Sequence, residues 1–290
     1  MLFFVTYRGH IELKIRRIFR HVSRTVYSYI FYFPKSYFDS VLYVTLIMTH
    51  YDYSAGSQRI NNFLNQKMDE EDRKKIPPES QMTYSNGYSM RIGAIFVDIR
   101  RSTELFASKD RDMVTRIARS FVSEVIQILQ SDPYSEIGIR GDCVYGIYST
   151  PSQSSIYEMY EKAVYVNTLM KLLNRHYAKK KYPQLRVGIG LAVNDDLVVK
   201  AGSKGSGIND RIWVGKAVPT ASNLSKYGNK NGIKPIVMSE TVYKNAIEPN
   251  LGKGIDSSWF SKANQGNDSF YHGDVVNIKF NNWVKNNSGL

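Results

Sequence analysis

Residues 92–238 alternate between short apolar segments and long amphipathic ones, and this order restricts the chain to a layered α+β or α/β fold. Apolar runs of strand length occur at 92–99, 136–140, 143–148, 185–193, 197–201, 211–214 and 235–238. Helical periodicity predicts long helices over 113–129 and 155–180 and a further helix from Ala217. With its flanking residues, this region has the size of one domain of about 200 residues.

The composition fits a folded protein in a reducing compartment. Hydrophobic residues make up 42% of the chain and aromatic residues 13%, which excludes global disorder. A single cysteine, Cys143, excludes an intramolecular disulfide framework and a cysteine-based zinc site, and so favours the cytoplasm. The net charge of +13 favours an anionic partner but does not choose among nucleic acid, nucleotide phosphates and lipid.

The N-terminal segment, residues 1–50, differs from the rest of the chain because it is basic and aromatic. It contains seven basic and two acidic residues, so the remaining chain has a net charge of +8. The pattern over 11–33 fits a helix on a membrane surface, a packing appendage, or a start codon placed too early. Its apolar runs are too short to span a bilayer, and no secretory cleavage pattern follows them.

Residues 51–87 are expected to form a helix and a linker ahead of the main domain. A helix is predicted over 54–68 with Ser54 as its cap, and the charged and proline-containing stretch 69–87 is typical of a linker. The main domain is then expected over 88–285.

The first candidate site residue is Asp98, at the end of the apolar strand 92–99. A polar turn follows it and opens a helix, which places a carboxylate beside free backbone N–H groups of the kind that bind phosphates. The alternative is an aspartate that only ends a strand, with Ser102 or Thr103 as the helix cap.

The second candidate, Asp142, lies 44 positions further along the chain, in a Gly141–Asp142 turn between two short strands. Gly-Asp is also favoured by ordinary hairpin turns, so this turn alone has no functional meaning. The pair is more informative, because two carboxylates on adjacent strand tips can bridge divalent cations about 4 Å apart.

Several motifs together resemble the class III nucleotide cyclases over roughly residues 88–245. They are Phe96–Thr103, Arg140–Asp142, Leu185–Ala192 and Ile212–Ser222, in this order. Within the class, Lys200–Gly215 is most similar to the pyrimidine cyclases of bacterial anti-phage Pycsar systems. The resemblance implies an α+β, ferredoxin-like domain whose central, mostly antiparallel sheet is flanked by helices.

The resemblance also implies a two-metal active site. Asp98, Asp142 and the Ile99 carbonyl would hold two Mn²⁺ or Mg²⁺ ions, which prefer oxygen ligands. The implied substrate contacts are Phe96, Ile99, Arg100, Arg101, Ser102, Thr103 and Arg140. Because the family builds its site across a two-fold interface, the two aspartates would face Ile212–Asn223 of a second subunit in a homodimer.

Two positions that read a purine base in the family are changed here. The family has a lysine four residues before the second metal aspartate, and Gly138 occupies that position here. The position of its partner aspartate is occupied by Ile212. Both changes argue against ATP and GTP. Arg140 shares the strand face of Gly138 and could donate to uracil O4, which slightly favours UTP over CTP; alternatively it pairs with Glu136.

The transition-state residues of the family also differ. The positions of its asparagine and arginine are occupied by Pro219 and Asn223. Asn223 can therefore donate a hydrogen bond but lacks the positive charge of the arginine. Nearby bases that could replace the arginine, each equally compatible with an ordinary surface position, are Lys216, Lys226, Lys230 and Arg211.

Three further features are expected to be structural. Gly188 and Gly190 indicate close packing on a strand, and Cys143 a small strand residue rather than a nucleophile. One strand is predicted over 274–280 in the polar C-terminal region.

These patterns predict a metal-dependent pyrimidine nucleotide cyclase that makes a 3′,5′-cyclic monophosphate and pyrophosphate from UTP or CTP. The product would be a second messenger in anti-phage defence, read by an effector that this chain does not contact. The alternatives are an adenylate or guanylate cyclase and a degenerate nucleotide-binding module. Nucleic-acid binding is not expected, because no recognition motif accompanies the charge.

Overall fold

The computed structural model describes residues 2–3, 44–45, 51–130, 135–266 and 268–287. The chain divides into two compact units, residues 1–66 and 67–290. The predicted membrane-surface helix over 11–33 lies outside the described residues. None of the helices in the described ranges is both long and apolar enough to cross a membrane.

In the first unit, two short strands pair and one helix is described. Strands β1 (Leu2–Phe3) and β2 (Val44–Thr45) are antiparallel, and helix α2 spans Tyr53–Asn65. The predicted helix is therefore present, but the cap prediction is wrong: Asp52 caps it through a 3.0 Å bond from the Ala55 N–H to Oδ1.

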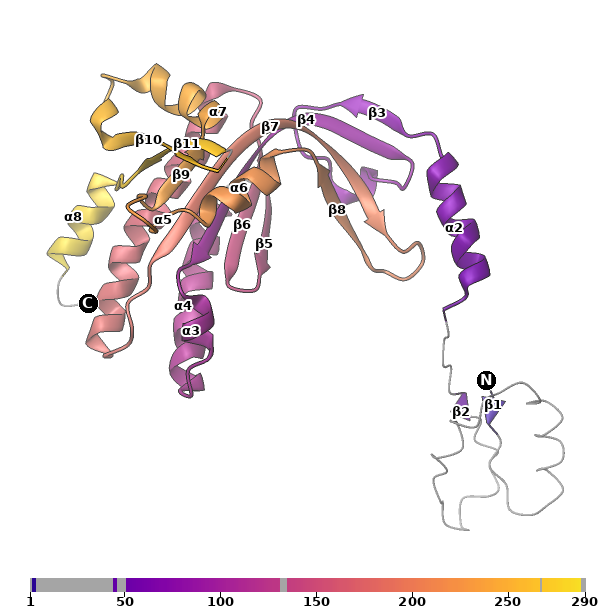
Figure 1. Cartoon of the computed structure of the whole chain (residues 1–290), viewed down its shortest axis with the longest axis horizontal. Coiled ribbons are helices and arrows are strands. Elements are labelled where there is room, and N and C mark those ends of the chain that lie inside the picture. Colours follow the sequence, from indigo (N-terminus) through magenta and orange to yellow (C-terminus); the bar gives the residue numbers. More distant parts are fainter. Residues whose placement is uncertain (1, 4–43, 46–50, 131–134, 267, 288–290) are drawn as a thin grey trace, which may run out of the picture. The chain divides into compact units, whose positions relative to one another are not determined.

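The second unit is built on a nine-stranded sheet (Figure 1). Its path runs β10-β11-β9-β7-β4-β6-β5, while β3 pairs with β4 and β8 with β7. All pairs are antiparallel except β3–β4 and β7–β9, which confirms the expected α+β class. The strands are β3 (Asp69–Asp72), β4 (Asn86–Ile99), β5 (Glu136–Arg140), β6 (Cys143–Ser149), β7 (Val187–Gly202), β8 (Asn209–Val214), β9 (Ile236–Ser239), β10 (Phe260–Gln265) and β11 (Asp268–Gly273).

The helices of the second unit cover both faces of this sheet. They are α3 (Ser102–Phe106), α4 (Arg111–Leu129), α5 (Gln153–Lys179), α6 (Ala217–Ser225), α7 (Glu240–Val242) and α8 (Ile278–Asn286), with short turns of other helix types at 79–81 and 243–259. Helix α4 begins where the Asp110 carboxylate accepts the Met113 N–H, and α5 begins in a capping box of Ser152 and Ser155.

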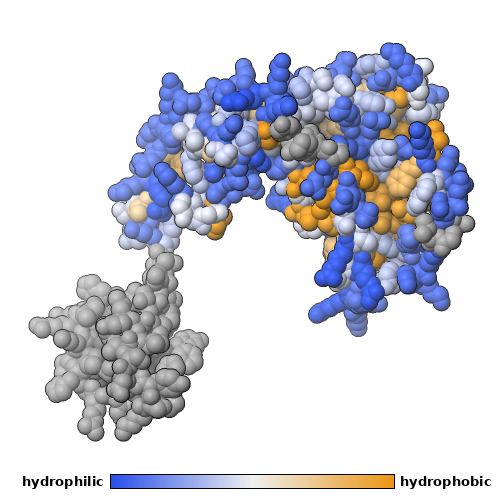
Figure 2. Space-filling model, turned by 180° about the vertical axis from the view of Figure 1, so that it is seen from behind, coloured by the Kyte–Doolittle hydropathy of each residue, from blue (hydrophilic) through white to orange (hydrophobic). Residues whose placement is uncertain are grey.

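The main core lies between the sheet and helices α4 and α5. Apolar residues of α4 recur three and four positions apart, so that Ile117, Phe121 and Val125 are fully buried against Ile95 and Val97 of β4. Seen from behind the view of Figure 1, apolar residues of this unit gather in one region bordered by polar ones (Figure 2).

Helix α6 covers the opposite face of the sheet, together with the segment 76–82. It lies directly on β7 because two strand positions have no side chain. A β-carbon at Gly190 would lie 2.0 Å from the Ala221 carbonyl, and one at Gly188 would lie 2.0 Å from the Ser225 carbonyl. The close packing expected for these glycines is confirmed.

The structure corrects three strand predictions. The separate strands expected over 185–193 and 197–201 are one strand, β7. Part of the predicted linker, Asp69–Asp72, is β3, which pairs with β4. No strand covers 274–280: the C-terminal strands are β10 and β11, and Ile278 begins helix α8.

Candidate active site

The candidate site lies where β4, β5 and β6 run side by side. Register pairs Asp98 of β4 with Cys143 of β6, and Cys143 with Arg140 of β5. The next row on the same face lies two residues away along each strand and consists of Phe96, Tyr145 and Gly138. The two-residue turn Gly141–Asp142 joins β5 to β6, so that Asp142 lies at the tip of this hairpin, directly beyond the first row.

The structure therefore brings Asp98 and Asp142 together, as the sequence predicts. Burial raises the pKa of Asp98 above its ordinary value; Arg100 opposes this shift, while the nearby negative charge of Asp142 adds to it. Lys230 and Lys226 also lie close enough to lower the pKa of Asp98. Asp98 thus has one carboxylate and three cations near it.

These residues fit an oxygen-ligated divalent cation. The Oδ2 atom of Asp142 is buried and has no hydrogen-bond partner among the described residues, although a buried carboxylate oxygen normally has one. No group of three or more histidine, cysteine, aspartate or glutamate side chains forms a metal cluster in the described ranges. A cation at Asp98 and Asp142 would thus need additional oxygen ligands, such as substrate phosphates.

The second row forms an aromatic platform. The rings of Phe96 and Tyr145 stack with their centroids 5.3 Å apart and 17° between their planes. The ring of Tyr145 also lies across Gly138, where an added β-carbon would be only 2.3 Å from Cζ. The position that would hold the purine-reading lysine is therefore covered by a tyrosine.

Arg140 and Glu136 do not form the pair considered as an alternative. Arg140 is exposed, whereas Glu136 accepts hydrogen bonds from Arg211 at 3.3 Å and from the Trp213 indole at 3.5 Å. Burial raises the pKa of Glu136, and these two hydrogen bonds oppose the shift. Arg211 also donates to the Pro77 carbonyl, so its guanidinium is used within the unit.

In the turn after β4, one backbone N–H group already has a hydrogen-bond partner within the protein. The Arg100 N–H donates to the Arg186 carbonyl at 2.8 Å, and Arg101 adopts the left-handed conformation with φ of 57°. Ser102 and Thr103 open helix α3 without a side-chain cap. The phosphate contacts expected of Arg101, Ser102 and Thr103, and the metal coordination expected of the Ile99 carbonyl, stay predictions.

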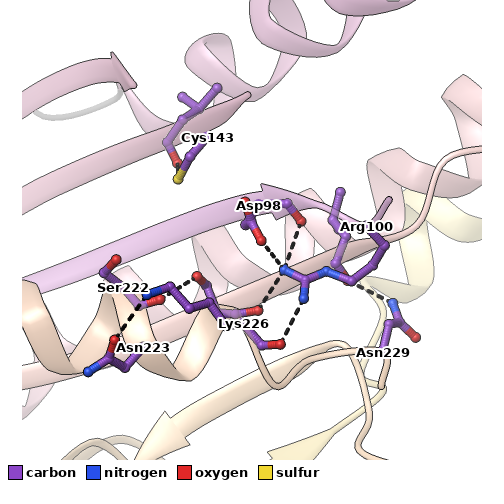
Figure 3. A network of polar contacts seen from close by, with 10 residues as sticks. Asp98, Arg100, Cys143, Ser222, Asn223, Lys226 and Asn229 are labelled. Atoms are coloured by element: carbon purple, nitrogen blue, oxygen red, sulfur yellow. Dashed lines mark hydrogen bonds and ion pairs between the residues drawn. The ribbon is translucent and has the colours of Figure 1, made fainter. Parts of the chain in front are cut away.

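The Arg100 guanidinium is engaged within the protein, in place of the phosphate contact expected of it. Its guanidinium bonds the Asp98 carboxylate and the carbonyls of Ser225 and Lys226 at the end of α6 (Figure 3). Only 7% of its side chain is exposed.

Asn223 lies on the exposed side of α6, four residues after Pro219, which is also exposed. Its Oδ1 accepts a 3.2 Å bond from the Lys226 ammonium (Figure 3). Its transition-state role stays a prediction.

The environment of Cys143 disfavours the thiolate form that a nucleophile needs. Burial, followed by the negative charge of Asp98, raises the pKa of its thiol to about 12. The thiol is therefore neutral at physiological pH, in agreement with its interpretation as a small strand residue.

Sequence reasoning missed one residue of the site, Tyr145, and one that positions helix α6, Asp196. Tyr145 could have been found, because the two-residue turn at 141–142 sets the register that places it opposite Gly138. Asp196 could not: it is buried within β7, and its carboxylate accepts the Lys216 and Ala217 N–H groups, each at 2.9 Å, at the start of α6.

Known proteins support this description at two levels. No family model matches the chain. The fold is similar to that of the guanylyl cyclase Cya2 (TM-score 0.55, 16% identity, 67% of this chain and 97% of that one). It is also similar to the adenylyl cyclase CyaB from P. aeruginosa (TM-score 0.54, 18% identity, 64% and 95%). The sheet and its helices thus have the fold of the guanylyl and adenylyl cyclases.

The sequence relatives are more specific. The chain is 47% identical over 245 residues to a uridylate cyclase of Treponema porcinum, covering 84% of each chain. It is 31% identical over 250 residues to a uridylate cyclase of Gulbenkiania mobilis, covering 82% of this chain and 97% of that one. The chain belongs to the family of these nucleotide cyclases.

Proposed function

We propose that this nucleotide cyclase converts UTP into 3′,5′-cyclic UMP and pyrophosphate. The observation that carries the choice of base is the position of Tyr145 over Gly138. The tyrosine ring occupies the space above Gly138. It leaves no room there for the side chain of a purine-reading lysine. Both relatives carry the name uridylate cyclase.

Arg140 is the candidate for reading the base. It lies on the same face as Gly138, one row closer to Asp98, and its side chain is exposed. A guanidinium only donates hydrogen bonds, so it matches the O4 acceptor of uracil and not the N4 donor of cytosine. UTP is therefore favoured over CTP.

The chemistry is an in-line displacement at the α-phosphorus. The ribose 3′-oxygen forms the new phosphorus–oxygen bond, the bond to the β-phosphate breaks, and the 3′-hydroxyl proton leaves to solvent. Bound by Asp98, Asp142 and the Ile99 carbonyl, two Mn²⁺ or Mg²⁺ ions would lower the pKa of the 3′-hydroxyl and neutralise the triphosphate. The protein orients the reacting groups and supplies positive charge from Lys226 and Lys230.

The complete site would lie between two copies of the chain. Pro219 and Asn223 are exposed on α6, so Asn223 of the partner subunit is available to face Asp98 and Asp142. A homodimer would then contain two sites.

The test of the activity is a panel of the four ribonucleoside triphosphates with Mn²⁺. We expect cyclic UMP as the main product, and its loss in an Asp98→Ala variant. A dominant cyclic CMP, cyclic AMP or cyclic GMP product would contradict the uridylate assignment. Absence of any cyclic product would leave a degenerate nucleotide-binding module as the remaining function.

We further propose that cyclic UMP is a second messenger in the cytoplasm of a bacterium that defends itself against phage. This role rests on the similarity of Lys200–Gly215 to Pycsar cyclases. Cells carrying the gene with its neighbouring genes should plate phage less efficiently than cells carrying the Asp98→Ala variant. Equal plating would contradict the defence role without affecting the cyclase assignment.

A further inference from the structure

Arg100 links the candidate metal site to the end of helix α6. Its Nη2 atom contacts the Asp98 carboxylate and donates to the Ser225 carbonyl at 2.9 Å, while Nη1 donates to the Lys226 carbonyl at 2.8 Å (Figure 3). Because these bonds use both terminal nitrogens of a nearly buried side chain, Arg100 is not free to reach into solvent for a phosphate.

The surroundings are shaped for this link. At Gly188, the β7 partner of Asp98, an added β-carbon would lie 2.0 Å from the Ser225 carbonyl and 3.0 Å from Arg100 Nη2. The last carbonyls of a helix carry partial negative charge and have no partner within the helix. The Arg100 guanidinium thus bonds both the carbonyls at the end of α6 and the Asp98 carboxylate.

Helix α6 in turn carries groups assigned to the reaction. Asn223 lies one turn before the carbonyls that Arg100 binds, and Lys226 follows directly. A change in how Arg100 is held therefore reaches Lys226, which the proposed function assigns to the site of the same subunit, and Asn223, which it assigns to the other site of the homodimer.

We propose that Arg100 is a positioning residue that couples cation binding at Asp98 to the C-terminal end of α6. In the cation-free protein, Arg100 neutralises Asp98 and anchors the helix. A divalent cation at Asp98 competes with the guanidinium for the same carboxylate, which weakens the anchor and loosens the helix end. This inference rests on the proposed metal site but not on the identity of the nucleotide.

Backbone hydrogen exchange of the full-length protein can test the coupling without nucleotide. The reporters are the Lys226 and Tyr227 N–H groups, which donate to the Asn223 and Leu224 carbonyls. In the wild type, saturating Mn²⁺ should speed their exchange by about fivefold. In Arg100→Gln they should exchange rapidly without Mn²⁺ and respond little to it.

A matched control removes the same charge elsewhere. Arg116 is exposed on α4 and pairs only with Asp112 in the described part of the chain, so Arg116→Gln should respond to Mn²⁺ like the wild type. If the wild type shows no response, or if Arg100→Gln responds like the wild type, the coupling is refuted.

Mn²⁺ affinity provides the second readout. Because coupling is reciprocal, removal of the competing guanidinium should tighten Mn²⁺ binding to Arg100→Gln by about fivefold, measured by calorimetry without nucleotide. Weaker binding than in the wild type would overturn the competition. Arg100→Lys, which keeps the charge but not the fork geometry, should keep weak Mn²⁺ binding and still show fast exchange.

The outcomes separate this inference from the proposed function. A protein that shows the exchange and affinity changes but makes no cyclic UMP refutes only the proposed function. A protein that makes cyclic UMP without these changes refutes only the coupling.

Discussion

Tyr145 and Gly138 lie opposite each other on β6 and β5, and the tyrosine ring occupies the space above the glycine. An added β-carbon at position 138 would be 2.3 Å from Cζ and 2.4 Å from the hydroxyl oxygen of Tyr145. The ring is held in this position by stacking on Phe96. The side chain that position 138 can hold is therefore limited by a residue on the neighbouring strand.

We expect Tyr145→Ala to weaken discrimination against purines. Removal of the ring opens space at the proposed base site, and steric discrimination of this kind is worth roughly 10- to 200-fold. The ratio of kcat/KM for UTP to that for ATP should fall by about tenfold or more. Tyr145→Phe keeps the ring and should keep the ratio; an unchanged ratio in Tyr145→Ala would contradict the role of the ring.

Asp142→Asn should remove activity without loss of stability. The buried Oδ2 of Asp142 has no partner in the described part of the protein, and its charge raises the pKa of Asp98. Neutralising it therefore costs no observed hydrogen bond and relieves a repulsion. We expect cyclase activity to fall by about 100-fold or more, while the free energy of unfolding changes by less than about 0.5 kcal/mol.

The matched control for this prediction is Asp112→Asn, on the exposed side of α4. It should retain both activity and stability. A strongly destabilised Asp142→Asn protein would show that the carboxylate has a structural rather than a metal-binding function.

Cys143 should resist alkylation in the folded protein. A thiol with a pKa of about 12 is deprotonated to about one part in 10⁴ at pH 8, roughly a thousandfold less than a thiol of pKa 9.0. Because a thiolate of higher pKa is also more nucleophilic, iodoacetamide should modify native protein at least about tenfold more slowly than urea-unfolded protein. Because the chain has one cysteine, the measurement needs no assignment; similar rates in both states would contradict the raised pKa.

Asp196→Ala should destabilise the domain by about 2 kcal/mol. The substitution leaves the Lys216 and Ala217 N–H groups without their carboxylate and opens a space beside Gly215. Urea unfolding measures the loss. Asp195→Ala, which removes only an exposed partner of Arg91, should change stability by less than about 0.5 kcal/mol; equal effects would contradict the capping role.

The order of strands and helices could be predicted from the sequence because most of these elements have clear apolar periodicity. The continuity of β7 could not be predicted, because the polar residues between 193 and 197 indicated a break between two strands. Asn194 and Asp196 interrupt the apolar pattern, yet they remain in the strand because Asn194 donates to Asp196 and Asp196 caps α6. A polar pair that serves a distant helix looks locally like a turn.

The C-terminal region was misjudged for a related reason. Val275 and Ile278 suggest a strand, but Asn277 between them caps α8 by accepting the Phe280 N–H at 2.9 Å. The actual strands, β10 and β11, are short and largely polar, and pairing rather than pattern defines them.

At the site, the sequence predicted the adjacent aspartates because each follows from a strand end or a tight turn. It could not predict the surroundings of Arg100. A basic residue beside a metal ligand suggests a phosphate contact, whereas its carbonyl partners come from a helix more than 120 positions later in the chain.

The pairing of β4 with β7 has a consequence for synthesis on the ribosome. β4 is complete at Ile99, but its long antiparallel neighbour begins only at Val187, and the carbonyls that hold Arg100 follow at Ser225 and Lys226. Until then, one side of an apolar strand is unpaired, which is the state most prone to wrong strand pairing. The emerging chain thus cannot assemble the surroundings of Asp98 until three quarters of it has been made.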